Sequence, residues 1–310
     1  MIIQPMNPPT SARGLNGMAA LPRWGVIRVQ GGDAQAFLQG QLTQDVAQPP
    51  PGAARLAGWC NPKGRLLASF IACKRSPQEF WLACSGDLLA ATLKKLALFV
   101  LRAQVRLADA SGELALYGLI GEAANSIAAI VPGADGFLAP LPPADGAARA
   151  LWIAPASRPA PPCPALPAAL WDWAAVRSGV ATVTAPVAGA FVPQMLNYES
   201  VDAVSFSKGC YPGQEVVARS QFRGAIKRRA FVGQVNGPAQ AGQEIFAPAG
   251  VADDPAGLIA QAAPAPEGGT AVIASLPLAA AGAGGDLRVG SPDGPPLAGL
   301  RLPYPLREDI

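Results

Sequence analysis

One segment of this 310-residue chain sets a single thiol among cations and turn-forming residues, directly before a predicted helix. It is KGCYPGQEVVAR, residues 208–219. Glycine and proline around Cys210 predict a loop, and residues 214–220 have the composition of a short helix. The helix N-terminus, Lys208 and Arg219 each favour the thiolate, which is a nucleophile and a soft ligand. We predict that Cys210 is a reactive residue and that Lys208 assists it.

The other cysteines carry no comparable pattern of neighbouring cations. They lie in apolar or proline-rich surroundings and are expected to be packing residues: Cys60, Cys73, Cys84 and Cys163. Five cysteines without a CxxC pair fit neither a disulfide framework nor a zinc or iron–sulfur thiolate site. The chain has no histidine, which excludes catalysis by Ser-His or Cys-His pairs. We therefore predict no stably bound metal and a reducing, cytoplasmic location.

Length and charge limit the classes of partner. The length suggests about two domains, and a net charge of +3 does not make nucleic acid the default partner. The longest apolar stretch, residues 88–105, carries three basic residues and predicts an amphipathic helix rather than a membrane span. Neither a heptad nor a long exposed apolar segment indicates an interface, so we expect a monomer.

One local cluster of basic residues follows the thiol segment. Its members are Arg219, Arg223, Lys227, Arg228 and Arg229. Two interpretations remain open from the sequence: a binding surface for an anionic ligand or an RNA backbone, and a solvated basic face.

The hydrophobic patterns predict a mixed α and β region followed by an all-β region. Strands are expected at residues 25–31, 55–60, 66–74, 80–84, 104–108, 114–119 and 150–154. Helices are expected at residues 34–39, with Asp33 as the cap, and at residues 88–101, 122–131 and 170–178. We predict a disordered tail over residues 1–22, an α+β region over 23–226, and a small all-β domain without helices over 227–310.

Four segments together resemble a known family. KGCYPGQEVVAR, FLQGQLTQDV (37–46), NPKGRLLASF (61–70) and FVPQMLNYE (191–199) are similar to the YgfZ family of folate-binding proteins, relatives of the glycine-cleavage T-protein. The resemblance implies an α+β fold of two intertwined split β-α-β lobes and a C-terminal β-barrel around a central cavity for tetrahydrofolate. It also implies a role in assembling or repairing iron–sulfur proteins, with an indirect effect on tRNA modification. Iron–sulfur proteins or assembly factors would then be partners.

The resemblance also implies which residues form the site. Lys208, Gly209, Cys210, Tyr211, Gly213, Gln214 and Glu215 match the family signature. Because a pterin needs amide or carboxylate partners, we expect Gln194, Asn197 and Glu199 to bind folate. The basic residues would suit its glutamate tail. The full set of expected folate-binding residues is Asn61, Lys63, Gln194, Asn197, Glu199, Tyr211, Gly213, Gln214, Glu215, Arg219 and Arg223.

The chain departs from the T-protein pattern at two places. Ala68 and Ser69 stand where T-proteins carry an acidic pair, and Ser178 stands where they carry a glutamate. Without these carboxylates, aminomethyl transfer lacks its expected acid. The alternative function, a folate-dependent aminomethyl or one-carbon transferase, would need another carboxylate such as Glu199 or Asp202. A third hypothesis is an RNA-binding accessory protein that uses the basic cluster.

Overall fold

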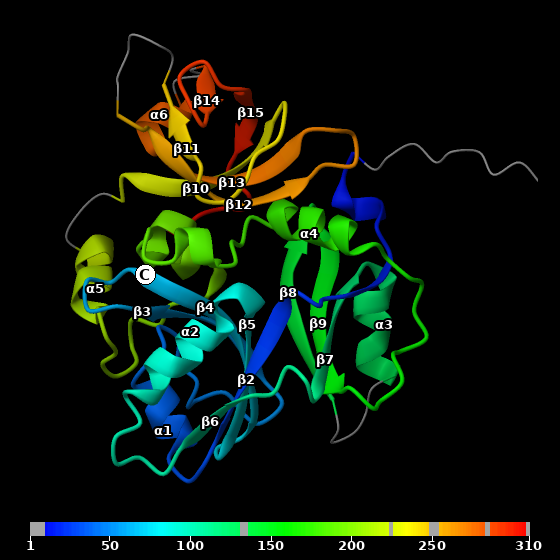
Figure 1. Cartoon of the computed structure of the whole chain (residues 1–310), viewed down its shortest axis with the longest axis vertical. Helices are drawn as coiled ribbons and strands as arrows, with labels where there is room; N and C mark the ends of the chain where they lie inside the picture. Colours follow the sequence, from blue (N-terminus) through cyan, green and yellow to red (C-terminus); the bar gives the residue numbers. More distant parts are fainter. Residues whose placement is uncertain (1–9, 131–135, 223–225, 248–253, 283–285, 308–310) are drawn as a thin grey trace, which may run out of the picture.

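The computed structural model describes residues 10–130, 136–222, 226–247, 254–282 and 286–307. It consists of two β-sheets that lie side by side and a β-barrel that covers one end of both (Figure 1). This arrangement is the α+β fold with a C-terminal barrel that the sequence predicted.

The first sheet has the strand order β3-β4-β5-β2-β6, and all of its pairs are antiparallel. Its strands are β2 (Trp24–Gln30), β3 (Ala54–Cys60), β4 (Leu66–Ser76), β5 (Glu79–Ser85) and β6 (Arg106–Asp109). The helices that pack on it are α1 (Ala34–Gln39) and α2 (Gly86–Ala97). Asp33 stands at the N-cap of α1 as predicted, but its carboxylate accepts a hydrogen bond from the Gln104 amide (2.8 Å) instead of capping the helix.

The second sheet has the order β1-β7-β9-β8 and corrects two expectations. Its strands are β1 (Gly17–Ala20), β7 (Leu114–Ile120), β8 (Phe137–Ala144) and β9 (Ala147–Pro155), and helix α3 (Glu122–Ile130) contacts it. The predicted disordered tail is wrong for residues 10–22, because β1 pairs with β7 in register from Gly17 to Ala20. Between β1 and β9 the chain thus passes from the second sheet to the first and back again, which intertwines the two lobes.

The barrel closes in the order β10-β13-β12-β11-β14-β15. Its strands are β10 (Arg228–Val235), β11 (Glu244–Phe246), β12 (Gly257–Pro264), β13 (Thr270–Pro277), β14 (Leu287–Val289) and β15 (Pro296–Arg301). The expectation of no helix in this region is wrong, because the short helix α6 (Leu278–Gly282) follows β13.

A long connection between the second sheet and the barrel carries most of the predicted site. It contains α4 (Ala168–Arg177), the 3-10 turns η2 (Ala185–Val187), η3 (Pro193–Leu196) and η4 (Tyr198–Val201), and α5 (Gln214–Phe222). A further 3-10 turn, η1 (Ala12–Gly14), precedes β1. Trp59, Trp171 and Trp173 are buried in the hydrophobic core.

Candidate functional site

The four segments of the family pattern meet at one place in the structure. Lys208 Nζ donates hydrogen bonds to the Gln39 and Leu42 carbonyls, the latter at 2.6 Å. The Leu66 amide donates to the Phe191 carbonyl at 2.8 Å. Gln194 Nε2 donates to the Val217 carbonyl of α5, also at 2.8 Å. We call this meeting of residues 37–46, 61–70, 191–199 and 208–219 the motif junction.

Two glycines let the thiol loop lie directly on the turn between β3 and β4. Gly213 has φ +80° and Gly64 has φ +71°, in the left-handed region that disfavours side chains. A Cβ atom at Gly213 would stand 2.4 Å from the Asn61 carbonyl oxygen and 2.7 Å from Gly64 Cα. Gly213 is therefore required, because the backbone of the NPKG turn leaves no space for a side chain at this position.

Lys208 is buried, and its ammonium group is hydrogen-bonded to backbone carbonyls of another segment. Besides its two carbonyl acceptors, its ammonium lies 5.2 Å from the centre of the Tyr211 ring. Burial lowers the pKa of Lys208 to about 8, and the charge of Asp45 partly opposes this shift. Among the described contacts, none joins the ammonium to the Cys210 thiol. The proposed assistance of Cys210 by Lys208 would therefore act through the shape of the loop.

Cys210 itself is exposed, whereas Lys208 and Tyr211 of the same loop are buried. Cys60, Cys73 and Cys84 are buried, and burial raises the pKa of each of these three thiols. Tyr211 is buried, and its hydroxyl has no hydrogen-bond partner in the structure. The loop thus turns its tyrosine inward and its thiol outward.

The amide and carboxylate residues expected to bind folate mostly hold the protein together. Asn61 Oδ1 accepts from the Lys63 and Arg65 amides and shapes the turn, while the Lys63 side chain is exposed. Asn197 Nδ2 donates to the Ala230 carbonyl (2.8 Å), and its Oδ1 accepts from the Ala230 amide (3.1 Å).

Glu199 is fully buried and pairs with Arg229 of β10. Its second oxygen, Oε2, has no hydrogen-bond partner. Together with Asn197, this pair fastens the motif junction to the barrel. Gln194 is also buried, and its Oε1 atom has no partner.

The basic cluster is not one continuous surface. Arg219 is exposed and forms a loose i,i+4 ion pair with Glu215 at 4.0 Å. Arg228 donates to the Ala256 and Ser275 carbonyls, and Arg229 is buried with Glu199. Arg223 lies outside the described residues. The interpretation as a solvated face or binding surface therefore applies to Arg219 and the exposed Lys227, but not to Arg228 and Arg229.

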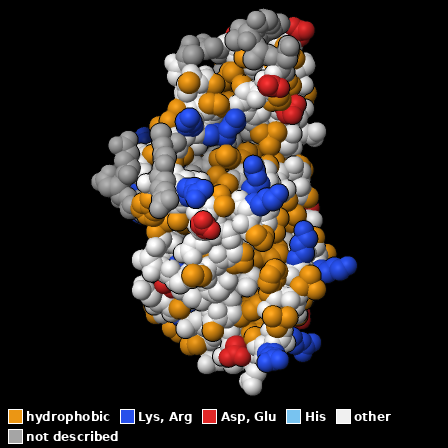
Figure 2. All heavy atoms as spheres, turned by 90° about the vertical axis from the view of Figure 1, so that its left-hand side faces the viewer, with side chains coloured by type: hydrophobic (Ala, Val, Ile, Leu, Met, Phe, Trp, Pro, Cys, Tyr) orange, Lys and Arg blue, Asp and Glu red, His pale blue; other side chains and the backbone are white. Residues whose placement is uncertain are grey.

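Figure 2 shows the face of the molecule that carries α5. Lys and Arg side chains lie among hydrophobic ones there, with few acidic side chains between them. Val216 and Phe222 of α5 are exposed, and Phe222 makes an edge contact with Phe206 (ring centres 5.3 Å apart). None of the described helices is long and apolar enough to cross a membrane.

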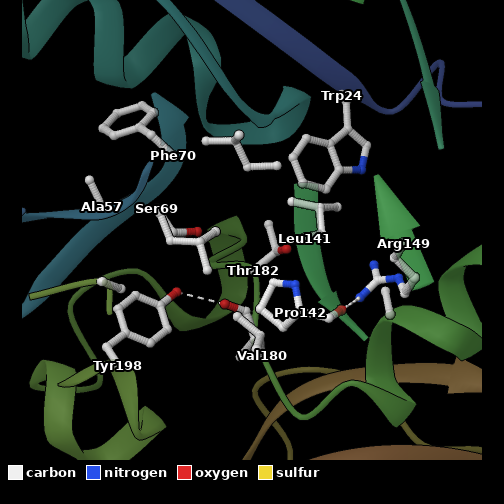
Figure 3. Close-up of a pocket in the computed structure, with 15 residues that line it drawn as sticks. Trp24, Ala57, Ser69, Phe70, Leu141, Pro142, Arg149, Val180, Thr182 and Tyr198 are labelled. Carbon is white, nitrogen blue, oxygen red and sulfur yellow. Dashed lines mark hydrogen bonds between the residues drawn. The ribbon is translucent and has the colours of Figure 1, made fainter. Parts of the chain in front are cut away.

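A pocket lies between the two sheets, beneath the connection (Figure 3). It contains about 560 Å³ of empty space, including the part open to solvent. Its lining residues come from both sheets, α4 and the connection: Trp24, Leu56, Ala57, Ser69, Phe70, Ile71, Leu141, Pro142, Arg149, Ala175, Val180, Ala181, Thr182, Tyr198 and Ala203. We call this the central pocket.

The polar groups of the central pocket are few. Ser69 Oγ accepts from the Val183 amide (2.9 Å), and the Tyr198 hydroxyl donates to the Ala181 carbonyl (2.6 Å). Arg149 adds a guanidinium, and Thr182 adds a further hydroxyl to the lining (Figure 3). The lining contains no acidic residue.

One of the two positions at which T-proteins carry an acidic pair belongs to the central pocket. Ser69 lines the pocket, whereas Ala68 is buried outside the lining. None of the residues predicted to bind folate belongs to the lining. Tyr198 lies inside the FVPQMLNYE segment and could have been found there, but Arg149 and Thr182 lie in segments with no distinctive pattern.

Comparison with known proteins adds a family and a fold. The GCVT N-terminal domain family matches residues 12–138. An uncharacterised protein of Haemophilus influenzae is 32% identical over 223 residues, which cover 70% of this chain and 72% of that protein.

Among solved structures, the glycine cleavage system aminomethyltransferase T from Bartonella henselae is similar in fold. It has a TM-score of 0.62 and 16% identity over 92% of this chain and 85% of its own. The heterotetrameric sarcosine oxidase from Corynebacterium sp. U-96 matches 45% of this chain and 75% of its own chain at 16% identity, with a TM-score of only 0.30.

Proposed function

Because this chain belongs to the folate-utilising GcvT-like superfamily, we propose that it binds tetrahydrofolate in the central pocket and supports the assembly or repair of iron–sulfur proteins. In this proposal it acts as a YgfZ-type protein. The effect on tRNA modification is indirect, through enzymes that depend on clusters. The observation that carries the proposal is the exposed Cys210 on a loop that is held in place by the buried Lys208 and Tyr211.

The lining of the central pocket offers the kinds of side chain that bind a flat heterocycle. Trp24, Phe70 and Tyr198 supply aromatic surface, and Ser69 and Thr182 supply hydroxyl groups. Arg149 supplies donors for acceptor atoms of a group attached to the ring. When bound, tetrahydrofolate would supply a carrier for a one-carbon unit, while these residues would bind and orient it.

Cys210 is suited to a different task from the pocket. An exposed thiol can hold a sulfur atom or one corner of a cluster for a short time, but it needs further ligands to retain a cluster. Those ligands would come from the client protein or assembly factor. The basic and apolar face around α5 (Figure 2) is where we propose that such a partner approaches.

The test combines binding with cellular function. Tetrahydrofolate is titrated into the wild type, Cys210→Ala and the control Cys163→Ala, and the activity of cluster-dependent enzymes is measured in cells that carry each variant. We expect all three proteins to bind tetrahydrofolate, and only Cys210→Ala to lose cellular function. Full cellular function of Cys210→Ala would contradict the role of the thiol, and a wild type that does not bind tetrahydrofolate would contradict the folate part.

The alternative of an aminomethyltransferase has less support. The central pocket lacks a carboxylate that could act on a folate nitrogen, because Ser69 lines the wall and Glu199 is paired with Arg229. Steady turnover of an aminomethyl donor by the purified protein would favour this alternative over the first proposal.

A further inference from the structure

Arg149 on β9 is a buried guanidinium with too few partners. Its side chain lines the central pocket (Figure 3), and the residue is 7% exposed. It stacks on the Trp171 ring at 4.5 Å from the ring centre. Its single hydrogen bond to the described part of the chain runs from Nη1 to the Pro142 carbonyl and is long, at 3.3 Å. A guanidinium has five N–H groups, so most of its donors have no acceptor in the protein, and Nε is among the buried atoms without a partner.

The other buried basic residues of the described chain provide a comparison. Lys74 donates to the Ala47 and Pro49 carbonyls at 2.7 and 2.8 Å. Lys208 also has two carbonyl acceptors, and Arg229 has the carboxylate of Glu199. Of these four residues, Arg149 alone has neither two close carbonyl acceptors nor a carboxylate partner, although an unpaired buried charge is strongly unfavourable.

The surroundings of Arg149 favour an anion. Burial lowers the pKa of Arg149 to about 9, so its guanidinium still carries a charge at neutral pH. No acidic residue lines the pocket, and Asp145, the acid four positions before Arg149, is engaged by Arg177 and Arg301. A negative group that enters the pocket would therefore meet a cation with no competing protein carboxylate.

We infer that Arg149 forms a binding site for a carboxylate group inside the central pocket. The planar fork of a guanidinium matches the two oxygens of a carboxylate. Stacking on Trp171 holds the fork flat. The other polar side chains of the lining are the hydroxyls of Ser69, Thr182 and Tyr198. A phosphate would need more cationic partners than this largely apolar pocket offers.

Two sources could supply the carboxylate. One is the glutamate tail of a folate, and in this case the inference rests on the proposed function. The other is a small free carboxylate that enters the pocket beside the folate or without it. Both use the same chemistry at Arg149, so the experiment must separate them.

The experiment measures binding to the whole chain by calorimetry and tryptophan fluorescence, because Trp24 lines the pocket. The probes are tetrahydrofolate, p-aminobenzoylglutamate, sodium formate, and 6-methyltetrahydropterin, which has no carboxylate. The variant is Arg149→Met. The matched control is Arg158→Met, because Arg158 also stacks on a tryptophan, Trp152, but does not line the pocket.

We expect Arg149→Met to weaken carboxylate binding by about tenfold to a hundredfold, the range of a hydrogen bond to a charged group. Binding of 6-methyltetrahydropterin should not change, and Arg158→Met should behave as the wild type. Loss of affinity for p-aminobenzoylglutamate assigns the site to the glutamate tail, and loss for formate alone assigns it to a small carboxylate. Arg149→Lys, which keeps the charge but not the fork, should also lose affinity for the carboxylates, and it replaces Arg149→Met if that variant does not fold.

Unchanged affinity of Arg149→Met for every carboxylate probe would overturn the inference, and so would an equal loss for 6-methyltetrahydropterin. If the proposed function is wrong, the same experiment gives a different result. In that case the wild type binds neither tetrahydrofolate nor 6-methyltetrahydropterin, while formate binding still tests Arg149.

Discussion

The motif junction and the central pocket both bury basic side chains, but these side chains differ in how many hydrogen-bond partners they have. At the junction, Lys208 has two carbonyl acceptors and Arg229 has a carboxylate. In the pocket, Arg149 has one long hydrogen bond. Satisfied polar groups hold a backbone in place, whereas unsatisfied donors are available to a ligand. The comparison teaches that most residues of the family pattern build the loop that presents Cys210, and that binding chemistry lies partly outside the pattern.

The largest effect is expected where the junction joins the barrel. Arg229→Met leaves the buried Glu199 carboxylate without its cation, so we expect the free energy of unfolding to fall by about 3–5 kcal/mol. Urea unfolding measures this change. The double variant Arg229→Met with Glu199→Gln should recover part of the loss. A single variant as stable as the wild type would show that the pair does not hold the two parts together.

The next effect concerns the close approach of the two turns. Gly213→Ala places a Cβ atom 2.4 Å from the Asn61 carbonyl oxygen at a residue with φ +80°. Backbone strain of this kind costs about 1–3 kcal/mol, and the steric overlap adds to it. The matched control is Gly209→Ala in the same loop, where a Cβ atom meets nothing within 4 Å. Equal melting temperatures for the two variants would contradict the packing of the loop on the turn.

Replacing the buried basic residues Lys208 and Arg149 tests the comparison of the two regions directly. Lys208→Met leaves the Gln39 and Leu42 carbonyls without their donor and should cost about 1–3 kcal/mol in chemical unfolding at pH 7. Arg149→Met removes a poorly paired buried charge and should leave stability unchanged or raise it. A larger loss of stability for Arg149→Met than for Lys208→Met would reverse the distinction between the two regions.

The pH dependence of stability tests the environment of Lys208. Burial lowers its pKa to about 8 in the folded protein from 10.5, so between these values the unfolded state binds more protons. Its unfavourable contribution is thus complete below pH 8 and is relieved as the pH rises through this window. The wild type should therefore gain stability relative to Lys208→Met between pH 8 and 10.5. A constant difference would show that the ammonium is not desolvated.

The smallest effect on stability is expected for Cys210→Ala. The thiol is exposed, and substitutions of exposed side chains usually change stability by no more than about 0.5 kcal/mol. Its melting temperature should match that of the wild type in the same preparation used for the functional test. A marked fall would mean that Cys210 has a packing role.

Local sequence patterns predicted most helices and strands, because neighbouring residues largely determine where these elements form. Residues 34–39 form α1, and the expected strand at 25–31 is β2, one residue earlier. The missed elements lacked such a pattern. β1 has only four residues, and β8 contains Pro140, Pro142 and Pro143, which indicate a loop. Proline is tolerated there because β8 is the edge strand of its sheet.

The sequence by itself determined that one loop rich in turn-forming residues presents a thiol before a helix, because turn formation and helix initiation depend on neighbouring residues. It also indicated that four separate segments belong together. Only the tertiary structure decided which polar side chains already have hydrogen-bond partners within the protein. Asn61, Asn197 and Lys208 are bonded to backbone, while Arg149 faces a pocket without an acid. Hydrogen-bond partners come from segments distant in the chain, so packing alone determines which donors remain free.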